Sequence, residues 1–275
     1  MAQNPLQQYF RQPKIFISLP SQGVYSKPGS IDGDVSNLPV YGMTGMDEII
    51  IKTPDALLTG ESTVKVIQSC CPSIKDPWGL SALDLDLVLS AIRIATYGKE
   101  LGLSATCPAC EEENDYDVDL TRMIDHFSKC KYDPRVVVGN LVITTQPLTY
   151  EQSTKFNVKN FELQQQIGQV DFIEDKEERQ KKINELWTQL ADVQRVIFAA
   201  TIESVQTETD TVTERGFIDE WLLNCDKEVI NTIRNHIDSN RQAWTMPKYK
   251  VSCMECKHEF DLAIDLDQAS FFATA

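Results

Sequence analysis

The sequence predicts an α+β protein: a discontinuous zinc-ribbon-like unit, an inserted helical region and an extended N-terminal arm. Three observations support this prediction. Two Cys-x-x-Cys pairs stand far apart, the segment between them has strong helical periodicity, and the first residues have almost none. We expect an arm (1–46), core helices with the first zinc knuckle (47–120), an inserted β-hairpin and helical region (121–247), and a second knuckle completing the ribbon (248–275).

The N-terminal arm is rich in Pro, Gly and Ser, and only residues 14–20 resemble a short strand. Its apolar side chains are costly to leave in water, so the arm either stays a loosely ordered tail or orders on a partner. In the second interpretation the partner-binding residues are Phe16, Leu19, Val24 and Tyr25.

The strongest prediction of a buried helix covers residues 83–99. Apolar side chains surround nearly its whole circumference, and Asp84 and Asp86 stand at its start, as the helix dipole favours. The proline of the 53–58 segment predicts a capped helical turn there. Two β-branched runs around Gly139 and Asn140 predict a β-hairpin over residues 135–145.

Two longer helices are expected over residues 149–170 and 175–204, followed by helices at 214–224 and 227–242. An apolar seam on the second of them alternates by three and four residues, as in a coiled coil. The simplest arrangement is an antiparallel hairpin within the chain, turned near 168–173, because sequential elements usually neighbour each other. If another subunit covers the seam instead, the partner-binding residues are Ile183, Leu186, Leu190, Val193 and Ile197.

The cysteines give the sharpest chemical signal. Cys107, Cys110, Cys253 and Cys256 form two Cys-x-x-Cys knuckles, and two such knuckles supply the four ligands of a closed tetrahedral Zn²⁺ site. Ordinary zinc ribbons separate their pairs by about 15–20 residues, whereas roughly 140 residues intervene here, so spacing alone is moderate evidence.

The residues that flank the two knuckles strengthen the zinc prediction. Counting from the first cysteine of each pair, both segments carry Glu at the sixth following position and Asp at the eighth. Asp and Leu then recur at the twelfth and thirteenth positions. We therefore expect one unit used twice, a knuckle that runs into a strand, with the two copies facing each other around a structural zinc ion.

Three alternatives remain for these cysteines. A redox Cys-x-x-Cys needs a thiol of low pKa, and the run Glu111-Glu112-Glu113 opposes thiolate formation. The thiols could instead join two chains through a metal or a disulfide, or His258 could replace one cysteine as a ligand. A catalytic zinc is disfavoured because four cysteines leave no open coordination position.

The charge balance excludes several classes of function. With 26 Lys and Arg against 41 Asp and Glu, the net charge of −15 is a poor match to nucleic-acid phosphates or an anionic membrane surface. No apolar run is long enough to span a bilayer, and no secretory signal is evident. Nucleotide-binding and hydrolase motifs are also missing, so we predict a non-enzymatic protein without catalytic residues.

Motifs along the chain resemble one known family. They are residues 16–23, residues 47–49 with 53–61, residues 84–98, and the two cysteine pairs. In this order they resemble the T4-type phage baseplate hub subunit family, over nearly the whole chain.

The resemblance implies a late protein of a contractile-tailed bacteriophage, located in the host cytoplasm during assembly and then in the virion. Its expected partners are other baseplate and tail proteins, and it brings no catalytic residues. We predict a structural subunit that acts through protein contacts, with a homo-oligomer left open. The alternatives are an assembly chaperone absent from the mature virion and a zinc-ribbon nucleic-acid-binding module, although the knuckle strands are acidic where that module needs a basic face.

Overall fold

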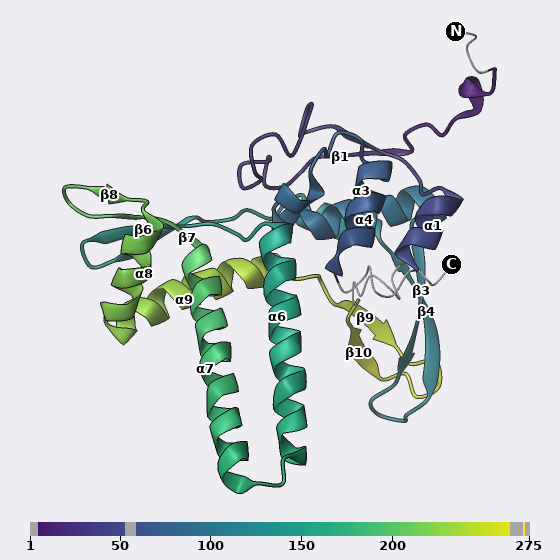
Figure 1. The fold of residues 1–275 in the computed structure, drawn as a ribbon. Helices are drawn as coiled ribbons and strands as arrows, with labels where there is room; N and C mark the ends of the chain where they lie inside the picture. Colours follow the sequence, from purple (N-terminus) through teal and green to yellow (C-terminus); the bar gives the residue numbers. More distant parts are fainter. Residues whose placement is uncertain (1–4, 53–58, 265–271, 273–275) are drawn as a thin grey trace. The chain divides into compact units, whose positions relative to one another are not determined.

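A computed structural model describes residues 5–52, 59–264 and 272 and divides the chain into two compact units. Unit 1 comprises Met1–Lys131 and Trp244–Ala275, and unit 2 comprises Tyr132–Ala243. The mixture of helices and small antiparallel sheets confirms the predicted α+β class (Figure 1). The helical turn expected at 53–58 lies outside the described residues.

The core of unit 1 forms around helix α4 (Ala82–Tyr97), which confirms the buried helix predicted from the sequence. The hydroxyl of Ser81 caps its first turn by accepting the N–H of Leu83, and Gly98 ends it with a φ of 95°. The elements packed around it are the helices α3 (Glu61–Cys70) and α5 (Thr121–Phe127) and the paired strands β1 (Ile15–Ile17) and β2 (Leu38–Val40). The helix α1 (Gly45–Ile51) and the short helix η2 (Pro77–Gly79) pack against α3.

The predicted arm folds against this core. Ile17 and Leu19 are buried, and the backbone of Leu19 donates to Val35. The next turn is tied to α4, because the backbone N–H of Ser21 donates to Asp84 at 3.1 Å and the Ser21 hydroxyl donates to the same carboxylate. Apart from η1 (Gln7–Tyr9), β1, β2 and the first two residues of α1, the described part of the arm is irregular, as its composition predicts.

The burial of Asp84 gives unit 1 a specific pH dependence. Burial raises the pKa of Asp84 to about 6, although the hydrogen bonds from Ser21 favour the carboxylate. The folded protein therefore binds this proton more tightly than the unfolded chain, and the contribution of Asp84 to stability is lost as the pH rises from about 4 to about 6. Asp84→Asn abolishes the titration, so we expect the stability of the variant relative to the parent to rise by about 2 kcal/mol between pH 4.5 and pH 7.5.

Urea unfolding at the two pH values measures this difference. Asp34→Asn is the matched control, because hydrogen bonds from Ser36 lower the pKa of the exposed Asp34. The control should gain no stability relative to the parent as the pH rises. An Asp84→Asn variant that follows the control would contradict the burial argument.

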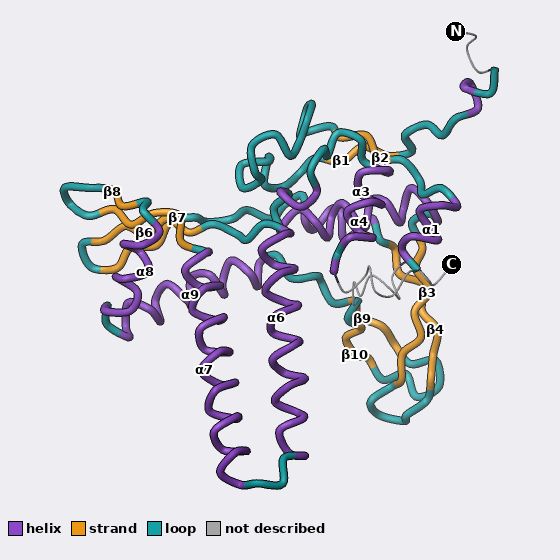
Figure 2. The backbone as a smooth tube through the Cα atoms, viewed as in Figure 1, coloured by secondary structure: helices purple, strands orange, loops and turns teal. Residues whose placement is uncertain are grey.

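Two antiparallel hairpins complete unit 1. The first pairs β3 (Glu100–Thr106) with β4 (Glu113–Asp119), and the second pairs β9 (Tyr249–Ser252) with β10 (Glu259–Leu262). Both appear as two-stranded ribbons (Figure 2). The strand β3 was not predicted from the sequence.

Unit 2 is built on a four-stranded antiparallel sheet in the order β5-β6-β7-β8. The hairpin predicted at 135–145 is confirmed as β5 (Arg135–Val138) and β6 (Leu141–Thr145), with Gly139 at a φ of 59° in the turn. The other two strands are β7 (Ile202–Gln206) and β8 (Thr211–Val212). The helices α8 (Arg215–Asn224) and α9 (Lys227–Ala243) pack on this sheet, with Ile143, Ile202, Ile218 and Ile233 in the shared core.

A helical hairpin is inserted between β6 and β7. It consists of α6 (Tyr150–Gln169), the short helix η3 (Val170–Phe172) and α7 (Lys176–Ala200), which run antiparallel (Figure 1). The prediction that α7 reaches residue 204 was wrong, because Ile202 begins a strand that pairs with β6. Among the described residues, no helix is both long and apolar enough to cross a bilayer.

Candidate metal centre

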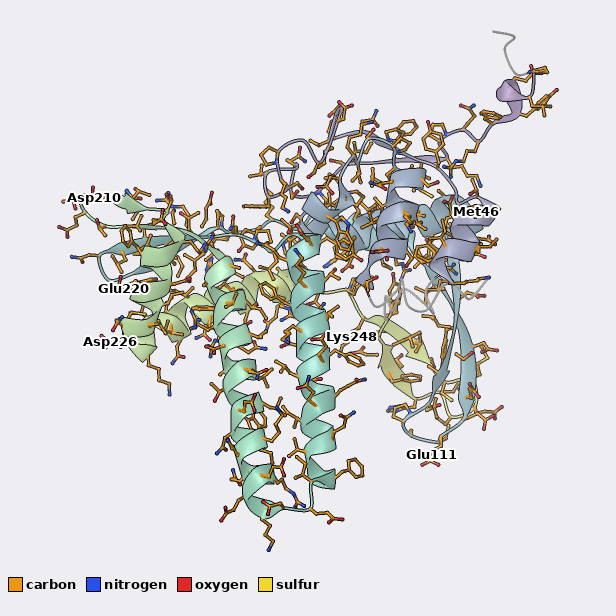
Figure 3. All side chains as sticks on the ribbon, viewed as in Figure 1. Met46, Glu111, Asp210, Glu220, Asp226 and Lys248 are labelled. Atoms are coloured by element: carbon orange, nitrogen blue, oxygen red, sulfur yellow. The ribbon has the colours of Figure 1, made fainter. Side chains whose placement is uncertain are left out.

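The two hairpins of unit 1 repeat the same local structure around their cysteines. In each hairpin, the residue just before the first cysteine pairs with the residue six positions after that cysteine. The pairs are Thr106 with Glu113 and Ser252 with Glu259. Each Cys-x-x-Cys therefore closes the end of a two-stranded ribbon. The label of Glu111 marks this end of the β3–β4 hairpin in Figure 3.

The backbone of each turn is also repeated. The N–H of Cys107 donates to the carbonyl of Glu112 at 2.8 Å, and the N–H of Cys253 donates to that of His258 at 2.9 Å. The fourth residue after each first cysteine has a positive φ, 61° at Glu111 and 59° at Lys257. Because a left-handed residue is uncommon outside glycine, its recurrence at the same position supports a repeated knuckle.

The four sulfur atoms converge on one point. They all lie within 4.8 Å of one another, with 3.7 Å between Cys107 and Cys256 and 3.6 Å between Cys110 and Cys253. A disulfide would bring two sulfurs to about 2.05 Å, and the cysteines here are free. In contrast, a tetrahedron with metal–sulfur bonds of about 2.3 Å has sulfurs about 3.8 Å apart, so the residues fit a tetrahedral zinc ion.

Backbone hydrogen bonds and the neighbouring thiols set the acidity of these cysteines. Backbone N–H groups of Cys256 and Glu255 lower the pKa of Cys253 to about 6. The N–H of Glu112 also favours the Cys110 thiolate, but the neighbouring thiols of Cys256 and Cys253 raise its pKa to about 12. Four thiolates at this distance repel one another, and a bound cation removes that repulsion.

The remaining thiols have a different environment. Burial raises the pKa of Cys70 to about 11 and raises that of the adjacent Cys71 as well. Both lie fully buried at the end of α3, as expected for core cysteines. His258 gives its backbone carbonyl to the second knuckle, and the four converging ligand atoms are all sulfur.

Asn114 joins the two knuckles, and the sequence did not single it out. Its side-chain amide donates to the carbonyl of Glu112 and lies 3.5 Å from the sulfur of Cys253, while its oxygen accepts the N–H of Met254 at 2.9 Å. The equivalent position of the second knuckle is Phe260, so the repeat is broken here. This difference between the two repeats is the feature of the sequence that could have identified Asn114 as a functional residue.

Aromatic side chains also connect the ribbons. The hydroxyl of Tyr116 donates to the carbonyl of Ser252 at 3.3 Å, and its ring meets that of Phe260 edge-on. The hydroxyl of Tyr249 donates to the carbonyl of Asp119 at 3.3 Å. The cysteines therefore stand at the end of an interface that the two hairpins share along their length.

The predicted partner-binding residues of the arm have different environments. Leu19 is inside the core of unit 1, and Tyr25 is half-buried. Phe16 and Val24 are exposed, with 57% and 73% of their surface accessible. The structure thus leaves Phe16 and Val24 at the surface and gives Leu19 an intrachain role.

The predicted seam of α7 is covered by α6 of the same chain. Leu186 is buried against Leu163 and Val170, and the flanking seam residues pack around them. The intrachain hairpin, the simpler of the two arrangements, is therefore the one observed. The partly buried residues in this cluster include Ile183, Leu190 and Val193, and Ile197 is also half-buried.

The fold and the site together define a two-unit α+β protein with a closed four-cysteine cluster of the kind that holds a structural metal ion. The family model described as T4 bacteriophage base plate protein matches residues 46–273. The chain belongs to this family, which implies a structural role in a phage baseplate and contacts with other tail and baseplate proteins. No curated protein and no solved structure matches the chain.

Proposed function

We propose that the chain is a non-enzymatic subunit of the hub region of a contractile-tail baseplate, with a structural zinc ion closing unit 1. The family match supports the baseplate role. The hub position is supported by the resemblance of residues 16–23 and 84–98 to motifs of hub subunits. The subunit acts through protein contacts in tail assembly and remains in the virion.

The zinc assignment is supported by the donor set. Four thiols from two rigid knuckles match the preferred ligands and the tetrahedral geometry of Zn²⁺, and they leave no position for water. When bound, the ion would link segments that are far apart in sequence. Cys107 and Cys110 would hold it from the first ribbon, and Cys253 and Cys256 from the second.

Quantitative mass spectrometry of purified virions and of baseplate intermediates tests the assignment. We expect peptides of this chain in both, at a fixed ratio to other baseplate proteins, and cryo-electron microscopy of intact tails should place the chain in the central hub. Its presence in intermediates but not in virions would show an assembly chaperone instead. A position at the baseplate periphery would refute the hub.

The bridging contact of Asn114 predicts an effect on metal affinity. In Asn114→Asp, a carboxylate replaces the amide that faces the sulfur of Cys253, so it repels the thiolate and cannot donate to it. We expect zinc affinity to fall by about 10- to 100-fold, as for other groups that support metal ligands. Competition with a chromophoric chelator measures the affinity, and Asp115→Asn, on the neighbouring exposed position of β4, should leave it nearly unchanged.

A further inference from the structure

Between Gln180 and Gln194, one flank of helix α7 is exposed and carries no charge, whereas Glu177 lies on the same flank in the first turn. Its residues recur at intervals of four and three, and from Asn184 onward each follows a seam residue by one position. They are Gln180, Asn184, Trp187, Ala191 and Gln194, all exposed. Trp187 leaves 55% of its surface accessible, although an indole ring is costly to leave in water.

A matching flank on α6 faces the same way. Gln164 and Gly168 follow the seam residues Leu163 and Ile167 by one position, and the exposed Asn157 and Phe161 extend the row. In an antiparallel pair of helices, the residues just after the seam of each helix lie on the same side of the pair. The two rows therefore form one surface, called here the uncharged face.

Apart from Glu177, the charged residues of the hairpin lie elsewhere. Those that stand just before the seam residues include Glu162, Lys182, Glu185 and Asp192. They pair locally, as in Lys159–Glu162, Lys182–Glu185 and Arg195–Asp192. Charge is thus segregated to the other side of the hairpin, in a chain whose net charge is −15.

Contacts within the chain do not account for the uncharged face. A Cβ atom added at Gly168 would meet nothing within 4 Å, so the described fold does not require a glycine there. Gln180 donates to Asn184 along the helix at 3.0 Å, which shows that amides on this face can pair with each other.

We propose that the uncharged face binds the same face of a second copy of this chain, in a two-fold arrangement of two helical hairpins. A two-fold interface uses one surface twice, so that surface must complement itself. Amide side chains do so because each carries both donors and acceptors, whereas clusters of like charge do not. Two chains of −15 repel each other, and a face without charge is where they approach at least electrostatic cost.

Sedimentation equilibrium of the purified full-length chain, from about 1 to 200 μM, tests the proposal. We expect a reversible monomer–dimer equilibrium that strengthens with added salt, because salt screens the repulsion between the two acidic chains. A chain that stays monomeric over this range at high salt would overturn the proposal. The measurement needs no other baseplate protein, so its result is independent of the proposed hub position.

Matched charge variants locate the interface. Gln164→Glu with Ala191→Glu places four carboxylates in a two-fold contact, and we expect the dimer dissociation constant to rise at least tenfold. The control, Gln165→Glu with Thr188→Glu, adds the same charge on the side of each helix that points away from the seam, and it should dimerise like the parent. Circular dichroism of both variants should show parental helix content. Equal dissociation constants in the two variants would refute this face as the interface.

Discussion

Cys107→Ser is expected to abolish metal binding and to unfold most of unit 1. A structural zinc ion contributes folding free energy of order 10 kcal/mol, which is comparable to the whole stability of an ordinary domain. Here the ion also has to offset the entropy of closing a loop of roughly 140 residues. We expect one zinc per parent chain, no bound zinc in the variant, and a parent melting temperature that falls when a strong chelator is added.

Unit 2 provides an internal reference for this experiment. Its core contains no residue of the four-cysteine cluster, so much of the helical signal from α6, α7, α8 and α9 should survive in the variant. Cys225→Ser is the matched control, because Cys225 is a half-buried thiol at the end of α8 and lies outside the cluster. Equal melting of Cys107→Ser and the parent, with no response to chelator, would exclude a structural metal.

Leu19→Ala should have the second largest effect, a loss of about 3 kcal/mol in the free energy of unfolding. Leu19 is fully buried, and removing a buried leucine side chain costs transfer free energy and leaves a cavity. Phe16→Ala, three residues earlier, removes a larger side chain that is 57% exposed, and it should change stability little. Urea unfolding of the two variants compares them directly.

The same pair of variants separates the two roles of the N-terminal arm. If the arm belongs to the core of unit 1, only Leu19→Ala is destabilised. If it instead orders on a partner, both variants should retain parental stability in the isolated chain. That outcome would contradict the packing described for Leu19.

Local patterns in the sequence were sufficient for much of the fold. The Gly139-Asn140 turn between two β-branched runs specified its hairpin, because the conformation of such a turn is set by a few residues. The apolar circumference of α4 likewise specified burial. The residues repeated around the two knuckles predicted that the four cysteines come together despite the long insertion. The structure places their sulfurs in one cluster.

Features that depend on distant pairing were not predicted. Residues 202–204 were predicted as the end of α7, yet residues 202–206 form β7 because β6 offers a partner strand. The role of Asn114 arises only when the second knuckle supplies the N–H of Met254. Neither partner is adjacent in sequence, so propensity and periodicity could not reveal these contacts.

The division of unit 1 by unit 2 has a consequence for biosynthesis. Ribosomes add about 5–20 residues per second, so the thiols of Cys107 and Cys110 emerge roughly 7–30 seconds before those of Cys253 and Cys256. Unit 2 is one continuous segment and can fold in that interval. The metal site, in contrast, has only two of its four cysteines until the second knuckle is synthesised. Residues translated after unit 2 therefore complete unit 1, and until they arrive the nascent chain holds Cys107 and Cys110 as free thiols.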